Sequence, residues 1–435
     1  MAKPTLSSHY LGRAPSPIRQ AQILFAERPD RDAVAVVNLA IGNVSLPMHP
    51  AMRRRLAELG NSGHGFADGV VRYTPSVGSD AARAAFLHLV RTAGFSTEGV
   101  DCVITDGGSQ AMELMILGVS GPASDRPILL VDPVYTNYVD FAKRVAVPTV
   151  AVGRALGDDG VFAPPDMQNL RRIIEEVRPS ALVVIPADNP TGRFIRQEEM
   201  RALAALCVDY NMWFVSDEAY RQLHYTGEPT SSIWGVTEAE VPGITGRRIS
   251  IESASKVWNA CGLRIGALMT DNAALHAKAV AEYTANLCSN ALGQAVFAAL
   301  ADESPEDLRR WYTEQRAYYA KMMRDFKAAM ESALPGIIVS SPDASLYSVI
   351  DFRRVAPADF DTGEFVRYCA EHGKAAIDGK PHTLLTAPMA GFYCSEEGMR
   401  AGRTQVRLAY VDTPAEMRKA PKLLAALFGD FLATK

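Results

Sequence analysis

The sequence has little of what several protein classes require. Its six cysteines lie far apart, the closest pair being Cys369 and Cys394, so it contains no CxxC pair and no zinc-ligand spacing. No apolar run approaches the roughly 18 residues of a membrane span, and the polar, proline-rich N-terminus lacks the apolar stretch of a secretory signal. We therefore expect reduced core thiols, no metal site, no membrane segment and a cytoplasmic protein.

An excess of positive charge is also missing. Lys and Arg number 45 against 49 Asp and Glu, which gives a net charge of −4. A protein that binds DNA or RNA usually needs basic side chains to neutralise phosphates, so nucleic acid is not an expected partner. With 48% hydrophobic and 22% charged residues, the composition is that of a soluble globular protein rather than a disordered or fibrous one. The length of 435 residues suggests two or three domains.

Short apolar runs alternate with amphipathic helical stretches in the central part of the chain. Near-continuous apolar runs indicate strands that are buried on both faces, and helical patterns at 167–178 and 197–210 separate some of them. The pattern predicts an α/β fold with a mostly parallel seven-stranded sheet flanked by helices, in which ligands bind where strands end. The seven runs are residues 101–106, 127–132, 149–152, 181–186, 212–217, 248–253 and 266–270.

The pattern changes at Pro305. A long helix opens there on an acidic first turn and ends before Pro335, and it is expected to connect to a smaller α+β domain. We predict a large domain at 46–309 and a small domain made of 1–45 plus 310–435. The small domain should contain apolar runs at 336–341, 345–352 and 404–411, and a last helix near 415–432 interrupted by Pro421; the stretches 155–166 and 225–247 should be surface loops.

The strongest chemical signal is the segment SASKVWNACGLRIG, residues 253–266. A lysine after a strand is usually a solvated charge and a poor nucleophile. Here Ser253 and Ser255 flank Lys256, and Arg264 follows between two glycines. Two hydroxyls and a guanidinium can surround one phosphate, and glycines permit close backbone approach. An amine beside such an anion site suits a cofactor that carries both an aldehyde and a phosphate.

This segment resembles the Schiff-base lysine signature of the class I/II aminotransferases, which are pyridoxal 5′-phosphate enzymes of fold type I related to aspartate aminotransferase. Further motifs of the family follow in its order from about Gly42 to Arg407, nearly the whole chain. The resemblance implies a fold type I large domain, pyridoxal 5′-phosphate as cofactor, and Lys256 as the residue whose amine condenses with the cofactor's aldehyde.

Two motifs after strands resemble the family's cofactor contacts. TDGGSQAMEL, residues 105–114, places glycines at a helix start, where backbone N–H groups and the helix dipole attract anions. A plain turn is the alternative; the resemblance implies a phosphate cradle made of Gly108, Ser109 and Gln110. In VDPVYTNY, residues 131–138, tyrosines often only pack, but the resemblance implies that Tyr135 stacks on the cofactor ring. Tyr138 is a less certain lining residue.

Two more motifs carry polar residues just past a strand. ADNPTGRF, residues 187–194, could be only a turn, yet it resembles the family's NPTG, whose asparagine donates to the cofactor's phenolic oxygen; this implies Asn189. In VSDEAYRQL, residues 215–223, Asp217 could cap a following helix. The resemblance instead implies that Asp217 pairs with the pyridine nitrogen and keeps it protonated, while Tyr220 shares the phenolic oxygen.

The remaining motifs concern the substrate and a second subunit. Arg407, in VRLAYV, resembles the family's arginine that binds the substrate's α-carboxylate, and Gly42 resembles the glycine whose backbone approaches it; Asn189 joins them as a substrate contact. Alternatively, Arg407 is a surface charge. The segment around Tyr73 resembles the one in which a tyrosine reaches the phosphate of the other subunit, which implies a homodimer with shared active sites.

The resemblance implies an aminotransferase that moves the amino group of an L-amino acid to a 2-oxo acid, with Lys256, Asp217 and Tyr220 as catalytic residues. The same framework serves lyases, decarboxylases, cyclases and oxidases that act on amino acids, so this alternative stays open. An effector-binding regulator is disfavoured, because only 41 residues precede Gly42. The substrate's side chain stays undetermined: Arg13, Arg19 and Arg72 could meet an acidic group, although each also fits a surface charge.

Overall fold

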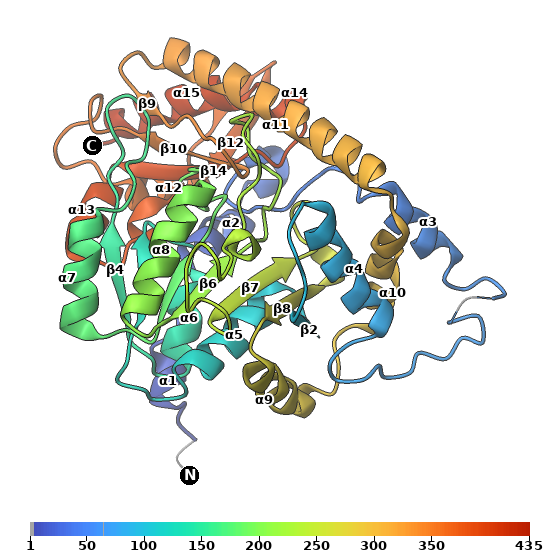
Figure 1. Ribbon diagram of the computed structural model, residues 1–435. Helices are drawn as coiled ribbons and strands as arrows, with labels where there is room; N and C mark the ends of the chain where they lie inside the picture. Colours follow the sequence, from blue (N-terminus) through green and yellow to red (C-terminus); the bar gives the residue numbers. More distant parts are fainter. Residues whose placement is uncertain (1–3, 64) are drawn as a thin grey trace.

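A seven-stranded sheet forms the centre of the protein in the computed structural model, which describes residues 4–63 and 65–435 except for the side chain of Pro17 (Figure 1). Its strand order is β2-β8-β7-β6-β5-β3-β4. Each of the seven predicted runs forms one strand, so this expectation is confirmed. The strands are β2 (Asp101–Thr105), β3 (Ile128–Asp132), β4 (Thr149–Gly153), β5 (Ala181–Val184), β6 (Trp213–Asp217), β7 (Arg248–Ser253) and β8 (Gly266–Thr270).

The sheet is mostly parallel, as predicted. β4, β3, β5, β6 and β7 run in the same direction, and only β8 is antiparallel to its neighbours β7 and β2. The carboxyl ends of the parallel strands therefore meet at one edge, and the chain turns back there from β7 into β8. Helices cover the sheet: α4 (Asp80–Thr92), α5 (Gly108–Val119), α6 (Asn137–Arg144), α7 (Met167–Val177), α8 (Gln197–Asp209) and α9 (Ala273–Tyr283). Helix α10 (Ala291–Phe297) packs against α4.

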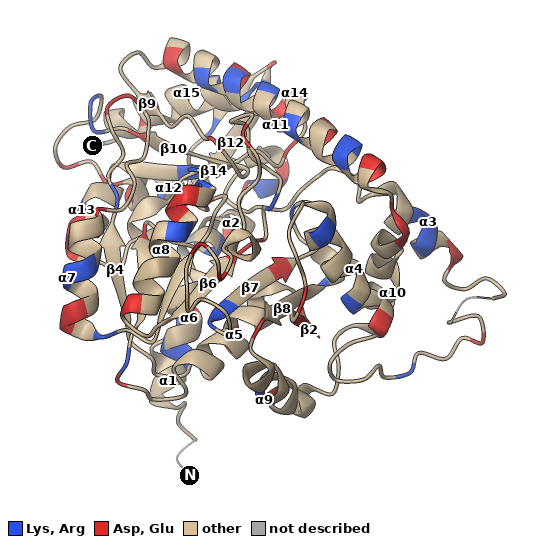
Figure 2. Cartoon of the chain, viewed as in Figure 1, with Lys and Arg blue, Asp and Glu red and all other residues tan. Residues whose placement is uncertain are grey.

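The long helix α11 (Pro305–Ala333) spans the top of the molecule in Figure 1. Ser304 caps its start by accepting a hydrogen bond from the backbone N–H of Asp307 at 3.1 Å, and the helix ends before Pro335, as predicted. Its inner side is buried and aromatic, whereas basic and acidic residues alternate along its visible side (Figure 2). α11 leads from the large sheet to two smaller sheets.

The smaller sheets join the two ends of the chain. β1 (Ala35–Asn38) pairs in parallel with β12 (Lys380–Leu385), so the N-terminal segment shares a sheet with the C-terminal part. The predicted division into 46–309 and 1–45 plus 310–435 requires such a contact; its boundaries stay a prediction. The other strands are β11 (Ala375–Ile377), β9 (Ile338–Val339), β10 (Tyr347–Asp351), β13 (Ala387–Pro388) and β14 (Gln405–Ala409), and the helices are α1 (Ser8–Leu11), α2 (Pro17–Glu27), α3 (Pro50–Glu58), α12 (Thr362–Glu371), α13 (Glu396–Gly402), α14 (Pro414–Met417) and α15 (Ala420–Ala433).

The stretches predicted as surface loops are partly buried. In 155–166, Leu156 and Phe162 form a β-bridge and lie in a small apolar cluster. In 225–247, Ile233 and Trp234 are buried. The carboxylate of Glu218 accepts the Ile233 N–H at 2.9 Å, which anchors this loop against the core. Glycine and proline content correctly indicated irregular backbone, but it did not indicate which apolar side chains the backbone carries inward.

Two smaller expectations also need correction. Pro421 does not interrupt the last helix; it lies in the first turn of α15, where a missing N–H does no harm, and a separate short helix precedes it. All six cysteines are free, but only Cys102, Cys207 and Cys369 are buried. The other three are partly exposed. No helix within 4–63 or 65–435 is long and apolar enough to cross a membrane.

Candidate active site

A cavity of about 890 Å³ opens where β5, β6 and β7 end and where β10 and β14 of the smaller sheet approach. Strand ends expose backbone groups and polar side chains to such a cavity, which is why ligands bind there in α/β sheets. Of the predicted site residues, Gln110, Tyr73 and Tyr138 do not line it. Those that do are Gly42, Gly108, Ser109, Tyr135, Asn189, Asp217, Tyr220, Ser253, Ser255, Lys256, Arg264 and Arg407.

Lys256 lies in the turn between β7 and β8, and its amine points into the cavity. Its Nζ donates a hydrogen bond to the carbonyl oxygen of Gly42 and contacts the hydroxyl of Tyr347. A Cβ atom at Gly42 would lie 2.7 Å from Nζ and 2.6 Å from the Tyr347 oxygen. Only glycine therefore lets the N-terminal segment approach this amine so closely.

Asp217 ends β6 and is buried at the base of the cavity. Its carboxylate accepts hydrogen bonds from the Tyr138 hydroxyl at 2.9 Å and from the backbone N–H of Ala219 at 3.1 Å. Burial raises the pKa of Asp217 to about 6. No helix follows it, so the helix-cap alternative is wrong, and the carboxylate has room for a cationic partner. Tyr138, the less certain candidate, is the residue that orients this carboxylate.

An anion site surrounds the start of α5. No side chain caps this helix, whose first turn begins at Gly108. The guanidinium of Arg264 lies against Gly107, where a Cβ would approach Nη2 to 2.5 Å. Arg264 donates to the carbonyl oxygens of Cys261 and Asp106 and has no carboxylate partner in the described part of the chain. Uncapped N–H groups, the helix dipole and an unpaired guanidinium together suit a phosphate.

Gln110 does not reach this anion site. Its side-chain oxygen accepts a hydrogen bond from the backbone N–H of Asp106 at 3.0 Å, within the turn that precedes α5. Gln110 is not among the residues that line the cavity, so its place in the phosphate cradle stays a prediction. Ser109, Ser253 and Ser255 do line the cavity, and Ser253 Oγ also accepts from the Ser255 N–H at 3.0 Å.

Arg407 is the largest fully buried side chain, with 1% of its surface exposed. Its guanidinium donates to Asn189 Oδ1 at 3.2 Å and to the Ala40 carbonyl oxygen, and it lies over the rings of Tyr347 and Phe392 at 4.5 and 5.0 Å. Its Nε has no partner, and burial lowers the pKa of Arg407. A buried guanidinium without a carboxylate calls for an anionic ligand. The interpretation of Arg407 as a surface charge is wrong.

Asn189 follows β5 beside this arginine. Since its Oδ1 accepts from Arg407, its amide nitrogen remains as a donor toward the cavity. Tyr135 also lines the cavity, and burial raises the pKa of its phenol to about 12, so the ring stays neutral. Both side chains line the cavity that also contains Asp217 and the start of α5.

Sequence reasoning missed Tyr347, which lies in β10 and is 2% exposed. Its hydroxyl lies 2.8 Å from that of Tyr220, and its ring packs on Arg407. The run at 345–352 was predicted as a strand, but nothing in its sequence distinguishes an inward-facing tyrosine at a cavity from one in the core. The N-terminal helix α2 also contributes Arg19 and Gln22 to the lining.

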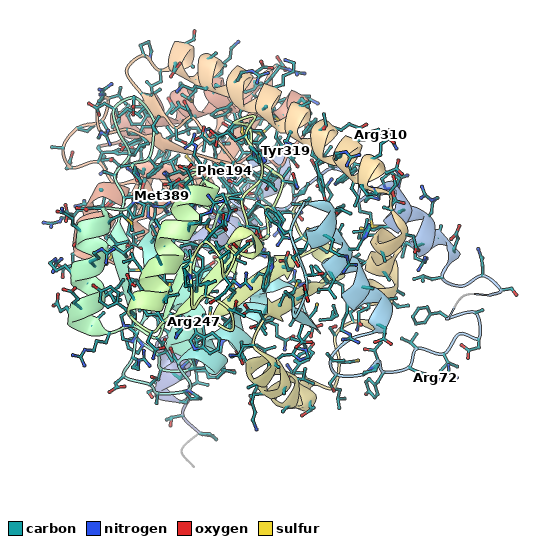
Figure 3. The ribbon with its side chains drawn as sticks, viewed as in Figure 1. Arg72, Phe194, Arg247, Arg310, Tyr319 and Met389 are labelled. Atoms are coloured by element: carbon teal, nitrogen blue, oxygen red, sulfur yellow. The ribbon has the colours of Figure 1, made fainter. Side chains whose placement is uncertain are left out.

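Tyr73 lies outside the cavity and is 78% exposed. It belongs to the segment between α3 and α4 that projects at the right of Figure 1. Its neighbour Arg72, labelled at the edge of Figure 3, pairs with Asp68 at 3.2 Å. Arg13 pairs with Asp140 at 3.3 Å. Of the three arginines considered for an acidic substrate group, only Arg19 lines the cavity.

Comparisons with known proteins agree with this geometry. Residues 34–408 match the family described as Aminotransferase class I and II. The chain is 26% identical over 375 residues to the aspartate/prephenate aminotransferase of Thermus thermophilus, covering 85% of this chain and 90% of that protein. It is 31% identical over 211 residues to a probable N-succinyldiaminopimelate aminotransferase of Mycobacterium tuberculosis, covering 46% and 48%. The solved structure of N-succinyldiaminopimelate aminotransferase from Mycobacterium tuberculosis superposes with a TM-score of 0.79 at 23% identity, covering 97% and 100%.

Proposed function

This chain belongs to the aminotransferase class I and II family, and on that basis we propose that it binds pyridoxal 5′-phosphate in the cavity and uses Lys256 as its catalytic amine. It is an aminotransferase that moves an amino group from an amino acid to a 2-oxo acid. Family membership supports this activity over the non-transaminating alternative and over an effector-binding regulator. The observation that carries the proposal is that three features lie in one cavity. They are the Lys256 amine, the anion site at the start of α5, and the buried Arg407, whose guanidinium has no carboxylate partner among the described residues.

The residues present suit this cofactor. Arg264, Ser109, Ser253, Ser255 and the start of α5 would hold its phosphate, and Asp217 would hold its ring nitrogen in the protonated form. When bound, pyridoxal phosphate supplies an aldehyde that condenses with amines and a ring that takes up the electron pair left by a departing proton. Neutral donors are the hydrogen-bond partners of the buried Asp217 carboxylate; burial raises its pKa, and these hydrogen bonds offset that rise only in part.

The chain's own side chains would orient the substrate and move its proton. The guanidinium of Arg407 offers donors to a substrate α-carboxylate, which fixes the direction of the α-carbon. The Lys256 amine, held beside Gly42, would take the α-proton as a general base and return it as a general acid. Asn189 and Tyr220 would donate to the cofactor's phenolic oxygen. The Tyr138 hydroxyl orients the Asp217 carboxylate by donating a hydrogen bond to it.

We further propose a homodimer with shared active sites. Tyr73 is exposed on a projecting segment and contacts no part of its own cavity, as expected for a side chain that completes the phosphate site of another subunit. The exposed valines Val70 and Val71 beside it would be covered in such an assembly. A cytoplasmic location stays a prediction.

Incubation with an amino acid and 2-oxoglutarate tests the proposed function. We expect stoichiometric glutamate and the 2-oxo acid derived from the donor, because both half-reactions use the same site. Release of ammonia or hydrogen peroxide without glutamate would contradict transamination and favour the lyase or oxidase alternative. An amino-donor panel, read from the change in the cofactor's visible absorption, would then rank the substrates.

We propose that the amino-group donor or acceptor carries a second carboxylate, which Arg19 meets. The relatives are named for aspartate, prephenate and N-succinyldiaminopimelate, compounds that each carry a carboxylate beyond the one next to the reacting carbon. Arg19 reaches the cavity from α2 and contacts only Gln22, at 3.5 Å, in the hydrogen bonds of the described residues. Its positive charge is therefore available to such a group.

Replacing Arg19 with glutamine should raise the KM for aspartate or glutamate roughly 10-fold, the effect of about one hydrogen bond to a charged group. The KM for alanine should change less than twofold, because alanine has no second carboxylate. Arg13→Gln is the matched control, since Arg13 already pairs with Asp140 outside the cavity. An equal change for alanine and aspartate would contradict the assignment of Arg19.

A further inference from the structure

Tyr347 is a buried side chain that lies beside three proposed active-site residues and has no role of its own so far. Its hydroxyl lies 2.8 Å from the Tyr220 hydroxyl and, like Lys256 Nζ, faces Gly42, and its ring packs against the Arg407 guanidinium at 4.5 Å. β10 fixes this position: Tyr347 pairs with Ala409 on β14, the strand that also carries Arg407. The residue therefore lies between the reacting amine and the group that would hold the substrate.

We propose that Tyr347 is a further catalytic residue, whose hydroxyl oxygen accepts a hydrogen bond from the Lys256 amine and stabilises that amine while it carries the substrate's proton. The inference rests on the proposed function, since it concerns the amine's role as a base. It adds a residue that was not among the sequence predictions, and it assigns the residue to the proton-transfer step.

The hydrogen-bond geometry accounts for every proton of the charged amine. When Lys256 takes a proton from the substrate's α-carbon, its nitrogen becomes an ammonium with three N–H donors and no acceptor. The carbonyl oxygen of Gly42 accepts one, and the hydroxyl oxygen of Tyr347, which faces the same glycine, would accept a second. The third stays free and can be returned to the substrate. The hydrogen of Tyr347 itself is then available to Tyr220, whose oxygen is within reach.

The electrostatic surroundings favour this arrangement. Burial alone would raise the pKa of Tyr347, but the positive charges of Lys256 and Arg407, together with hydrogen bonding to Tyr220 and Lys256, outweigh it and lower the pKa instead. An oxygen on which negative charge is favoured is a stronger acceptor for an ammonium. Glycine at position 42 is a second requirement of the same arrangement, because a side chain there would separate Nζ from the Tyr347 oxygen.

Tyr347→Phe in the cofactor-loaded enzyme removes only the hydroxyl. We expect kcat to fall roughly 10- to 100-fold, part of what a positioned base contributes, with KM changed less than about threefold. The primary isotope effect with an α-deuterated amino acid should rise, because proton transfer becomes more fully rate-limiting. Tyr319→Phe is the matched control: Tyr319 lies buried on the inner side of α11 (Figure 3), and its hydroxyl has no partner. The Tyr319→Phe variant should leave kcat and KM unchanged.

A second measurement does not depend on turnover. In the chain without cofactor, an amine-acylating reagent and mass spectrometry give the labelling rate at Lys256 relative to the exposed Lys278. Tyr347→Phe should speed labelling at 256 severalfold, because the protonated, unreactive form of the amine has lost an acceptor. An unchanged labelling ratio together with an unchanged isotope effect would overturn the proposal.

A Tyr220→Phe background separates direct action on Lys256 from action through Tyr220. We expect Tyr347→Phe to lower kcat and speed Lys256 labelling in that background as well. If both effects vanish there, Tyr347 acts only through Tyr220 and the proposal is wrong. Failure of the wild-type enzyme to transaminate would instead contradict the proposed function.

Discussion

Replacing Lys256 with alanine is expected to lower the rate of transamination by about 10⁴-fold or more. The expected loss is large because one amine serves as the cofactor's covalent attachment point and as the base, and a positioned base alone contributes about 10² to 10⁴. The structure supports both roles, since Nζ is the only lysine amine among the residues that line the described cavity. Stopped-flow spectroscopy measures the expected loss in the rate of transamination.

Borohydride reduction followed by peptide mapping tests whether Lys256 is the cofactor's covalent attachment point. Wild-type protein should carry the reduced cofactor on the peptide that contains Lys256, and Lys256→Ala should carry none. Lys278→Ala, an exposed lysine on α9, is the matched control and should behave as wild type. Reduced cofactor attached to a different lysine in the wild-type protein would show that position 256 is the wrong assignment.

Changing Arg407 to lysine should lower kcat/KM for amino acids by about 10²- to 10⁴-fold. Two hydrogen bonds from a charged donor contribute about 1.5–3 kcal/mol each, and a lysine amine cannot reproduce the planar fork that makes both. The change keeps a positive charge in the site, so the buried neighbours Asn189 and Tyr347 still face a cation. A loss of this size would therefore report on the geometry of carboxylate binding rather than on charge alone.

An amino acid amide provides the control for Arg407. Since the amide lacks the α-carboxylate, wild type and Arg407→Lys should convert it at rates within about threefold of each other, both slowly. A thermal melt of the variant separates substrate binding from loss of the fold, because Arg407 is also packed between two aromatic rings. Equal losses for the acid and its amide would assign Arg407 a structural role instead.

Local sequence patterns predicted the large sheet well. Most strands of that sheet are short apolar runs buried on both faces, and only the edge strand β4 is mostly half-buried; burial on both faces requires a continuous apolar pattern that a short sequence window reveals. The polar residues directly after the runs, such as Asp217 and Lys256, reach the same edge because parallel strands share their direction. Those residues could therefore be placed in one site before the structure was known.

Residues whose partners are distant in sequence could not be placed in this way. Tyr138 contacts Asp217 across 79 positions, and Tyr347 contacts Tyr220 across 127. Their roles depend on how β10 and α6 pack against the sheet, and no local pattern carries that information. Gln110 is an opposite case. Its motif resembles a cofactor contact, but its side-chain oxygen accepts a hydrogen bond from the backbone N–H of Asp106.

By itself, the sequence determined the fold class and the family and indicated Lys256 as the proposed reactive lysine, because each depends on patterns within a few residues or on motifs in order along the chain. Tertiary structure alone decided which arginine of the N-terminal region reaches the cavity, that Arg407 is buried without a carboxylate partner, and that a tyrosine of the smaller sheet touches the lysine. Burial and contact arise when separate segments pack together, and that is the physical reason why the sequence left them open.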